Sequence, residues 1–442
     1  MRFSRVAPLL PLASAFVLPE PEIFSKIEKS GKQLADNTQN ILGDTFRSLK
    51  DGAKDAYSKV EQAGFDVTAW LESAEFDGPH HGKPHHGKPH HGEPHHDEPP
   101  CPPNRTVYEL INESKYTTKL AELINEYDDL VELLNGTSAN YTVFAPTDKA
   151  FEKIPEHAPK PPKDFLKNLL LYHVTNDLYP AGRVLKSYTI PTLYETSKNL
   201  GHAQRLAPKV TLKGPTLNYY SRIVSVNHLG TNGIVHGVDN ILVPPPNVAR
   251  IITMFPGEFS TLELALIQTG IFEKMNNTDY EHNGGTFFAP SNYAFKKLGP
   301  RANAFLFSKY GGKYLKALLE YHIVVDQTLY SDAFIDGTKD GDDKATDIHS
   351  SQFHYDLPTL LSDKYLSVDV GRWGPFVEIR INGFSRVTAS DGVASDGVIH
   401  VVSNVLIPPR NPGGDQVFWN GEELEVEDLK ERLQPFVDNM EL

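Results

Sequence analysis

A histidine-rich repeat in the sequence has side chains suited to binding metal ions. Its histidines occur as four pairs with a period of five residues. They are His80, His81, His85, His86, His90, His91, His95 and His96. Neutral imidazole is a good ligand for zinc, copper and nickel, but a metal centre also needs fixed ligand geometry and outer partners. The repeat therefore predicts at most weak zinc, copper or nickel binding, or a charge that grows in an acidic compartment; no other cofactor is expected.

An acidic segment near residue 340 matches a calcium-binding loop in part. If Asp336 is position one, Asp340 and Asp347 fall at positions five and twelve, and Gly341 falls at position six. Thr338 weakens the ligand set, and the final acid is shorter than the usual bidentate glutamate. The pattern favours a solvated acidic insertion, with calcium binding as the alternative.

Two tyrosine-histidine pairs, Tyr172-His173 and Tyr321-His322, each end an apolar pattern of helical spacing. An imidazole at such a place can contact a partner. A histidine at the end of a buried helix, however, more often satisfies a backbone group. The spacing therefore favours a structural role for both pairs, with partner contact as the alternative.

The sequence carries no local signature of an enzyme. It lacks a nucleophile elbow, a His-Glu-X-X-His zinc site, a phosphate-binding glycine loop and a dinucleotide fingerprint. Catalytic triads are spatial rather than sequential, so scattered acids and histidines can still form a site. Even so, no residue type or spacing motivates catalysis, and the sequence predicts a protein that is not an enzyme.

One strand-like segment occurs twice and organises the chain. The copies begin at Asn232 and Asp396, place His236 and His400 at the same position, and end in a pair of prolines. The Asn-Gly or Asp-Gly pair predicts a tight turn, and the prolines are expected to stop the strand because they lack an N–H to donate. We expect both histidines to be hydrogen-bonded structural residues.

The elements before each copy also repeat in the same order. In the first unit they are a helix over 116–134 capped near Thr117, a strand over 141–145, a short helix near 150, a helix ending at 172, and strands at 210–212 and 223–226. In the second unit Ser260-Thr261 are expected to open a helix, followed by a strand over 286–290 and a helix capped by Ser291. Helices gathered before strands predict an α+β fold with helices on antiparallel sheets.

Three of these motifs resemble the fasciclin-like domain. They are the run Tyr-Thr-Val-Phe-Ala-Pro-Thr-Asp-Lys-Ala-Phe from residue 141, the tyrosine-histidine pair, and Asn-Gly-Ile-Val-His-Gly-Val-Asp-Asn-Ile-Leu from residue 232. The resemblance covers about 104–246 and 250–410, which sets the domains at 104–246 and 247–411. It implies that each domain is a wedge of two β-sheets with packed helices.

The resemblance also implies a function. Fasciclin-like proteins act in adhesion or matrix organisation rather than catalysis, and Tyr172, His173, Tyr321 and His322 match the residues most often linked to adhesion. A cell-surface, wall-polysaccharide or matrix component is the implied partner. The histidine-rich linker is similar to fungal members, some of which reside in the vacuole.

The N-terminus predicts entry into the secretory pathway. Residues 1–18 combine early arginines, an apolar run and a small-residue cleavage site, as in a signal peptide. Five glycosylation sequons agree with this route, at Asn104, Asn112, Asn135, Asn140 and Asn276. No later run is long enough to span a bilayer, and no hydrophobic tail predicts a lipid anchor. We expect a secreted, cell-surface or vacuolar protein.

Three further segments surround the domains. Residues 19–77 have the pattern of an amphipathic helical segment, and residues 78–103 form the histidine-, proline- and glycine-rich linker. The linker holds the single cysteine, Cys101, through which two chains could pair. The acidic tail, 412–442, has apolar residues at helical spacing, which predicts either a helix docked on the second domain or a partner-binding tail. The formal charge of −14 argues against a nucleic-acid partner.

Overall fold

The structure is a computed structural model of the chain. It describes residues 103–155, 161–195, 200–211, 214–277, 283–332, 351–362, 364–373, 376–410, 418–419, 421 and 424–437. Several predictions lie outside these residues: the signal peptide, the 19–77 segment, the histidine repeat, Cys101 and the acidic segment 336–347.

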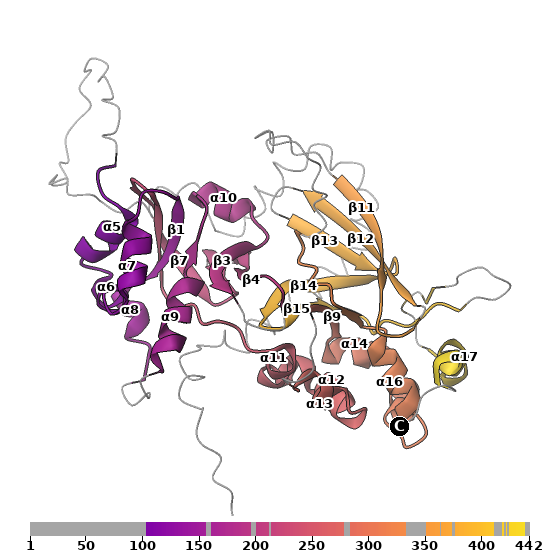
Figure 1. Cartoon of the computed structure of the whole chain (residues 1–442). Coiled ribbons are helices and arrows are strands. Elements are labelled where there is room, and N and C mark those ends of the chain that lie inside the picture. The colour runs from indigo at the N-terminus through magenta and orange to yellow at the C-terminus, as the bar shows by residue number, and fades with distance from the viewer. Residues whose placement is uncertain are drawn as a thin grey trace, which may run out of the picture.

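The first domain combines helices with a sheet whose strand order is β2-β1-β8-β7-β6-β5 and with a separate pair, β3-β4 (Figure 1). Its helices are α5 (Val107–Glu113), α6 (Thr118–Ile124), α7 (Asp128–Asn135), α8 (Asp148–Phe151), α9 (Lys163–Tyr172) and α10 (Ala181–Lys186). Its strands are β1 (Tyr141–Pro146), β2 (Val174–Thr175), β3 (Ile190–Glu195), β4 (Ala203–Leu206), β5 (Pro208–Thr211), β6 (Gly214–Leu217), β7 (Ser221–Gly230) and β8 (Gly233–Val238).

The second domain repeats this plan with the strand order β10-β9-β15-β14-β13-β12-β11. Its helices are α11 (Val248–Met254), α12 (Pro256–Gln268), α13 (Ile271–Met275), α14 (Asn292–Lys297), α15 (Pro300–Leu306), α16 (Gly312–Glu320) and α17 (Val426–Val437). Its strands are β9 (Gly285–Pro290), β10 (Ile323–Val325), β11 (Ser351–Pro358), β12 (Tyr365–Trp373), β13 (Phe376–Ile381), β14 (Ser385–Ala394) and β15 (Gly397–Val402). The α+β prediction is confirmed.

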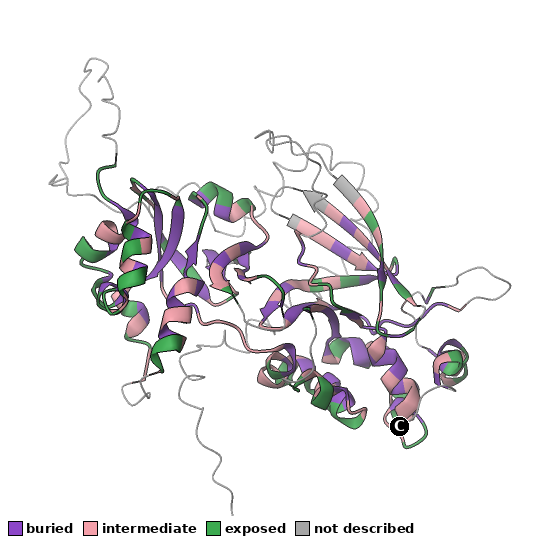
Figure 2. Cartoon of the chain, viewed as in Figure 1, coloured by how far each residue is buried: buried purple, intermediate pink, exposed green. Residues whose placement is uncertain are grey.

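The large sheet of each domain is mixed rather than purely antiparallel, which corrects the expected pairing. The closing strand β8 lies parallel to β1, and β15 lies parallel to β9. Every other pair that involves these four strands is antiparallel. Parallel neighbours require a long crossover, and here every other strand of the domain lies between the first strand and the closing one in the sequence. In Figure 2 these central strands are largely buried.

One long strand in each domain joins two sheet segments. At its start β7 pairs with β6, and further along it pairs with β8 through two register shifts. The strand β14 does the same between β13 and β15. Asn227 and Asp391, which lie at these irregularities, have positive φ angles of 60° and 61°. Such bulges bend a strand and increase its twist, so the two segments lie at an angle, as expected for a wedge.

The predicted tight turn before each closing strand is present. Gly230 pairs with Gly233 and Ala394 with Gly397, which leaves two turn residues in each case. The side chain of the second turn residue also holds the first helix of its domain. The Asn232 side-chain oxygen accepts the N–H of Val107 at 2.8 Å, and the equivalent Asp396 accepts the N–H of Val248 at 2.8 Å. The turn therefore caps a helix distant in sequence.

The prolines do not stop the closing strands, contrary to expectation. The strands end at Val238 and Val402, well before Pro244 and Pro408. The N–H of Asp239, just past β8, still donates to the Arg222 carbonyl of β7 at 3.0 Å, whereas the N–H of Leu242 donates to a histidine ring. The chain has therefore left the sheet before it reaches the prolines.

Two helix boundaries differ from the sequence prediction. The expected helix over 116–134 is two helices, α6 and α7. The last buried residue of α6, Ile124, and the first of α7, Leu130, are six positions apart. One straight helix would therefore turn the buried residues of α7 away from the side that α6 buries. The helix α12 begins at Pro256 rather than at Ser260, because proline is well suited to the first helical turn. The predicted Ser291 cap of α14 is confirmed.

The described part of the C-terminal tail packs on the second domain. Leu429 and Leu433 of α17, together with Trp419, are buried in the core of that domain. Arg432 is also buried and donates to the carbonyl of Pro408 at 3.4 Å. The docked-helix interpretation is therefore confirmed, and α17 belongs structurally to the second domain.

Gly233 cannot carry a side chain in this fold. A Cβ atom there would lie 2.1 Å from the carbonyl oxygen of Tyr141, on the adjacent parallel strand. We predict that Gly233→Ala lowers the free energy of unfolding by about 2 kcal/mol or more. Chemical denaturation measures this change. Gly182→Ala is the matched control because a Cβ at Gly182 meets nothing within 4 Å; an equal loss in both variants would contradict the prediction.

Candidate functional site

The histidine of each tyrosine-histidine pair joins a helix to the chain that follows the closing strand. In the first domain His173 Nδ1 lies 2.7 Å from the carbonyl of Leu169, and its Nε2 accepts the N–H of Leu242 at 2.9 Å. A carbonyl can only accept and an N–H can only donate, so Nδ1 carries the proton and the ring is neutral. His322 makes the same two bonds, at 2.7 and 2.8 Å. The predicted structural role of both histidines is confirmed.

The adjacent tyrosines are equally buried and satisfied. The Tyr172 hydroxyl donates to the carbonyl of Arg205 at 3.0 Å and accepts from the Asn218 amide at 2.8 Å. Tyr321 likewise donates to a backbone carbonyl and accepts from Asn382, at 3.1 and 3.0 Å. The exposed fraction of both tyrosines is 0%.

This burial corrects the suggestion that these four residues contact an adhesion partner directly. Tyr172, His173, Tyr321 and His322 are at most 1% exposed, and their polar atoms already have partners inside the domain. In this structure the four side chains support the fold of their own domains.

The histidines of the closing strands are structural too. His236 Nε2 donates to the carbonyl of Tyr179 at 2.7 Å, and its ring stacks on Phe144 with 5.6 Å between centroids. His400 repeats the arrangement, with Nε2 2.8 Å from the carbonyl of Leu329 and a 5.6 Å stack on a phenylalanine. The prediction of hydrogen-bonded structural histidines is confirmed.

Burial keeps all four of these imidazoles neutral. Desolvation lowers the pKa of His173, His236 and His322 to about 4, although a hydrogen bond to a carbonyl opposes the shift in each case. Desolvation also lowers the pKa of His400, and the nearby Asp391 carboxylate opposes it. An unfolded chain would bind protons at these positions near a pKa of about 6.5.

We predict that both domains lose stability as the pH falls from about 6.5 towards 4. In this range the unfolded chain binds protons that the folded chain does not, so the free energy of unfolding falls by up to about 1.4 kcal/mol per pH unit for each histidine. Urea denaturation at a series of pH values measures the loss, and an unchanged m-value would show that the same transition is followed. Constant stability between pH 7 and 5 would contradict the predicted burial of neutral rings.

The five sequon asparagines lie on the exterior. Asn104, Asn112, Asn135, Asn140 and Asn276 are all exposed. Two of them occupy equivalent places at the ends of α7 and α13. Asn135 accepts from the Thr106 hydroxyl at 2.8 Å and Asn276 from the Asn247 amide at 3.2 Å, and both donors cap the first helix of their domain. The fold leaves room for glycans at these sites, and glycosylation itself remains a prediction.

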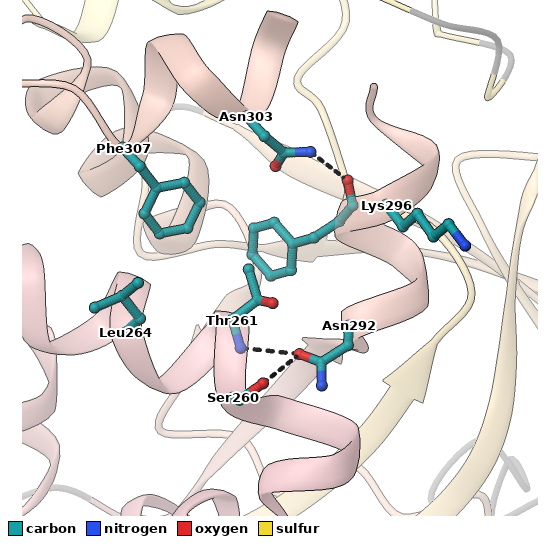
Figure 3. A pocket seen from close by; sticks show the side chains of 8 residues that line it. Ser260, Thr261, Leu264, Asn292, Lys296, Asn303 and Phe307 are labelled. Atoms are coloured by element: carbon teal, nitrogen blue, oxygen red, sulfur yellow. Dashed lines mark hydrogen bonds between the residues drawn. The ribbon is translucent and has the colours of Figure 1, made fainter. Parts of the chain in front are cut away.

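An open hollow of about 540 Å³ lies between α12, α14 and α15 of the second domain (Figure 3). It is lined by Ser260, Thr261, Leu264, Asn292, Phe295, Lys296, Asn303 and Phe307. Its amides serve the fold, since Asn292 accepts the N–H of Thr261 at 2.8 Å and Asn303 donates to the carbonyl of Phe295 at 2.6 Å. These side chains form no pairing of a nucleophile with a base.

The hollow borders a surface that is apolar only in the second domain. Asp148 accepts hydrogen bonds from α6 in the first domain, and Asn292 accepts the equivalent bonds from α12 in the second. These bonds show which exposed helical positions of the two domains are equivalent. Three exposed positions differ: Leu264, Ile267 and Tyr293 in the second domain stand where the first has Glu122, Asn125 and Lys149. The three apolar side chains, here called the apolar helical face, are 55%, 54% and 56% exposed. Comparing the two copies residue by residue would have revealed this face from sequence.

The described residues hold neither a metal cluster nor a membrane-spanning helix. Within the ranges given above, no three His, Cys, Asp or Glu side chains come together in a way that could hold a metal ion. The same ranges contain no helix with the length and apolar character needed to cross a membrane. The histidine repeat and the acidic segment 336–347 lie outside these ranges.

The sequence matches the family model of the fasciclin domain twice, over residues 115–244 and 257–408. The chain belongs to the fasciclin-domain family. The resemblance seen in the sequence motifs is thus confirmed for both copies.

Known relatives include fungal and animal proteins. The chain is 29% identical over 360 residues to aurofusarin biosynthesis cluster protein S of Gibberella zeae, covering 76% of this chain and 87% of that protein. It is 27% identical over 275 residues to human periostin, covering 61% of this chain but only 28% of periostin. A solved FAS1 domain pair from the insect cell adhesion molecule fasciclin I is 18% identical, with a TM-score of 0.33, covering 65% of this chain and 96% of that one. Family membership rests on the sequence match.

Proposed function

We propose that this protein is a non-enzymatic adhesion or surface- and matrix-interaction glycoprotein of the secretory pathway. Its membership of the fasciclin-domain family is the observation that carries the proposal. The likeness to periostin and to a fungal protein over most of that protein's length supports it. The burial of the conspicuous tyrosines and histidines also favours a binding role, because they support a rigid scaffold rather than a reactive cleft.

The apolar helical face is the surface we assign to binding, and a protein is the partner we assign to it. Leu264 and Ile267 offer no hydrogen bonds to the hydroxyls of a polysaccharide, whereas the buried centre of a protein interface is apolar and is enriched in tyrosine. The first domain carries polar residues at the same positions, so the fold itself does not require apolar side chains there.

We predict that the variant Leu264→Glu, Ile267→Asn, which installs the residues of the first domain, weakens binding to a surface or matrix protein about tenfold or more. The free energy of unfolding should change by less than about 0.5 kcal/mol because both side chains are exposed. Biolayer interferometry against immobilised matrix proteins, wall polysaccharide and cell-surface fractions measures the binding.

Glu122→Gln with Lys149→Gln is the control, because it alters the equivalent face of the first domain. Binding of the natural chain to none of these materials would remove the support for adhesion. Binding that survives in the Leu264→Glu, Ile267→Asn variant would retain adhesion but exclude this face.

A second function is suggested by the histidine repeat: metal sequestration or pH sensing in a lumenal, vacuolar setting. Eight histidines at a five-residue period give a high local density of neutral imidazoles. We predict that zinc or copper binding, measured by calorimetric titration, falls when residues 78–98 are removed. Equal affinity with and without the repeat would exclude it. Imaging a copy tagged after residue 18 separates a vacuolar from a secreted protein.

A further inference from the structure

The two domains meet along β4 and β5 of the first and β14 of the second. The amide of Gln204 donates to the carbonyl of Ala394 at 3.0 Å, and Arg205 pairs with Asp332 at 3.0 Å. A small buried cluster contains residues from both domains, namely Ala207, Tyr330, Val393 and Val398. The contact therefore has an apolar centre with polar bonds around it.

A second ion pair across this contact, between Lys209 and Asp391, is more buried than that of Arg205 with Asp332. Lys209 Nζ lies 2.7 Å from Asp391 Oδ2, and it also donates to the Ser390 hydroxyl at 3.0 Å. The Asp391 side chain is 0% exposed and that of Lys209 is 20% exposed. Removing one partner of such a buried pair leaves a charge without compensation, so the pair resists separation of the domains.

The two copies of the module show that Asp391 does more than its own domain requires. Its counterpart is Asn227, with the same positive φ and with an N–H directed at the equivalent histidine ring at 3.4 Å. The Asn227 oxygen accepts the N–H of Ala181 at 2.9 Å, and Asp391 accepts the N–H of Ser331 at 2.7 Å. The neutral side-chain amide of Asn227 thus makes, in the first domain, the same backbone bond that the Asp391 carboxylate makes in the second. The charged second oxygen, Oδ2, is the additional feature: it accepts from the Ser331 and Ser390 hydroxyls of its own domain and pairs with a lysine of the other domain.

We infer that the Lys209–Asp391 pair is an interdomain lock, which holds the two fasciclin domains as one rigid unit. A partner that contacts both domains would therefore meet surfaces at a fixed distance and angle. This inference does not depend on the identity of that partner. It concerns the orientation in which any binding surface is presented.

The charges around Asp391 keep the lock closed in mild acid. Burial raises the pKa of the Asp391 carboxyl, but the charge of Lys209 and the hydrogen bonds from Lys209 and Ser331 outweigh this effect and leave the pKa below its ordinary value. The neutral ring of His400 and the hydroxyls of Tyr219 and Tyr330 also lie near this carboxylate. A carboxyl with a lowered pKa adds stability at higher pH and loses it only as the pH falls below about 4. The lock therefore persists over the range in which the buried histidines begin to destabilise the domains.

The test is Asp391→Asn in the full chain, since the amide oxygen retains the bond to the Ser331 N–H while the charge is lost. We predict that hydrogen exchange of backbone amides in β4 and β14 becomes about tenfold faster or more, while β1 and β9 exchange as before. Calorimetry should also show the two domains unfolding in separate transitions. Lys209→Met, which retains the aliphatic stem, should have the same effects.

Arg222→Gln is the control, because it breaks an ion pair with Asp239, at 2.8 Å, inside the first domain. It should leave exchange at the domain contact unchanged. Natural exchange rates in both Asp391→Asn and Lys209→Met would overturn the inference. Faster exchange throughout the second domain would also overturn it, since that would show an intradomain role for the carboxylate.

Discussion

Each domain depends on one buried imidazole that satisfies two backbone groups at once. Leu169 near the end of α9 presents a carbonyl, and Leu242 after the closing strand presents an N–H; both meet at His173. Without the ring, each group would be buried without a partner, at a cost of about 1–3 kcal/mol apiece. The ring thereby fixes where the helix ends relative to the chain that follows the strand. Since His322 makes the same bonds, the two domains share one internal constraint.

That constraint extends to the contact between the domains. Tyr172, next to His173, donates to the backbone of Arg205 in β4. The Arg205 side chain in turn pairs with Asp332 of the second domain and lies over the ring of Tyr330, 5.0 Å from its centroid. The tyrosine-histidine pair of the first domain thus positions a strand that the second domain packs against. This buried pair therefore supports the domain contact from inside the first domain.

Local sequence patterns predicted the α+β class, the repeat, the turn before β8 and the Ser291 cap, because each depends on neighbouring residues. They did not predict the parallel pairing of β1 with β8, since nothing local at Tyr141 specifies a partner about ninety positions away. They also missed the break between α6 and α7, where the buried face is set by the core. At the candidate site the sequence correctly favoured structural histidines. A residue-by-residue comparison of the two copies could have revealed the apolar helical face, whereas the Asp391 lock became recognisable only from the contact between the domains.

The differences between the copies are informative because buried and exposed positions face different physical limits. A buried polar group must retain both its shape and its hydrogen-bond partner, so the bonds of His173 recur at His322. An exposed position has no such limit. Glu122 of the first domain and Leu264 of the second can therefore occupy equivalent positions with little effect on folding. Asp391 is the exception, a buried position where the copies differ in charge. A buried charge is costly unless it is paired, and Lys209 supplies the pair from the other domain. Hydrogen bonds from Ser331 offset part of the cost of burying that charge, and the ion pair that offsets the rest forms only when the two domains are in contact.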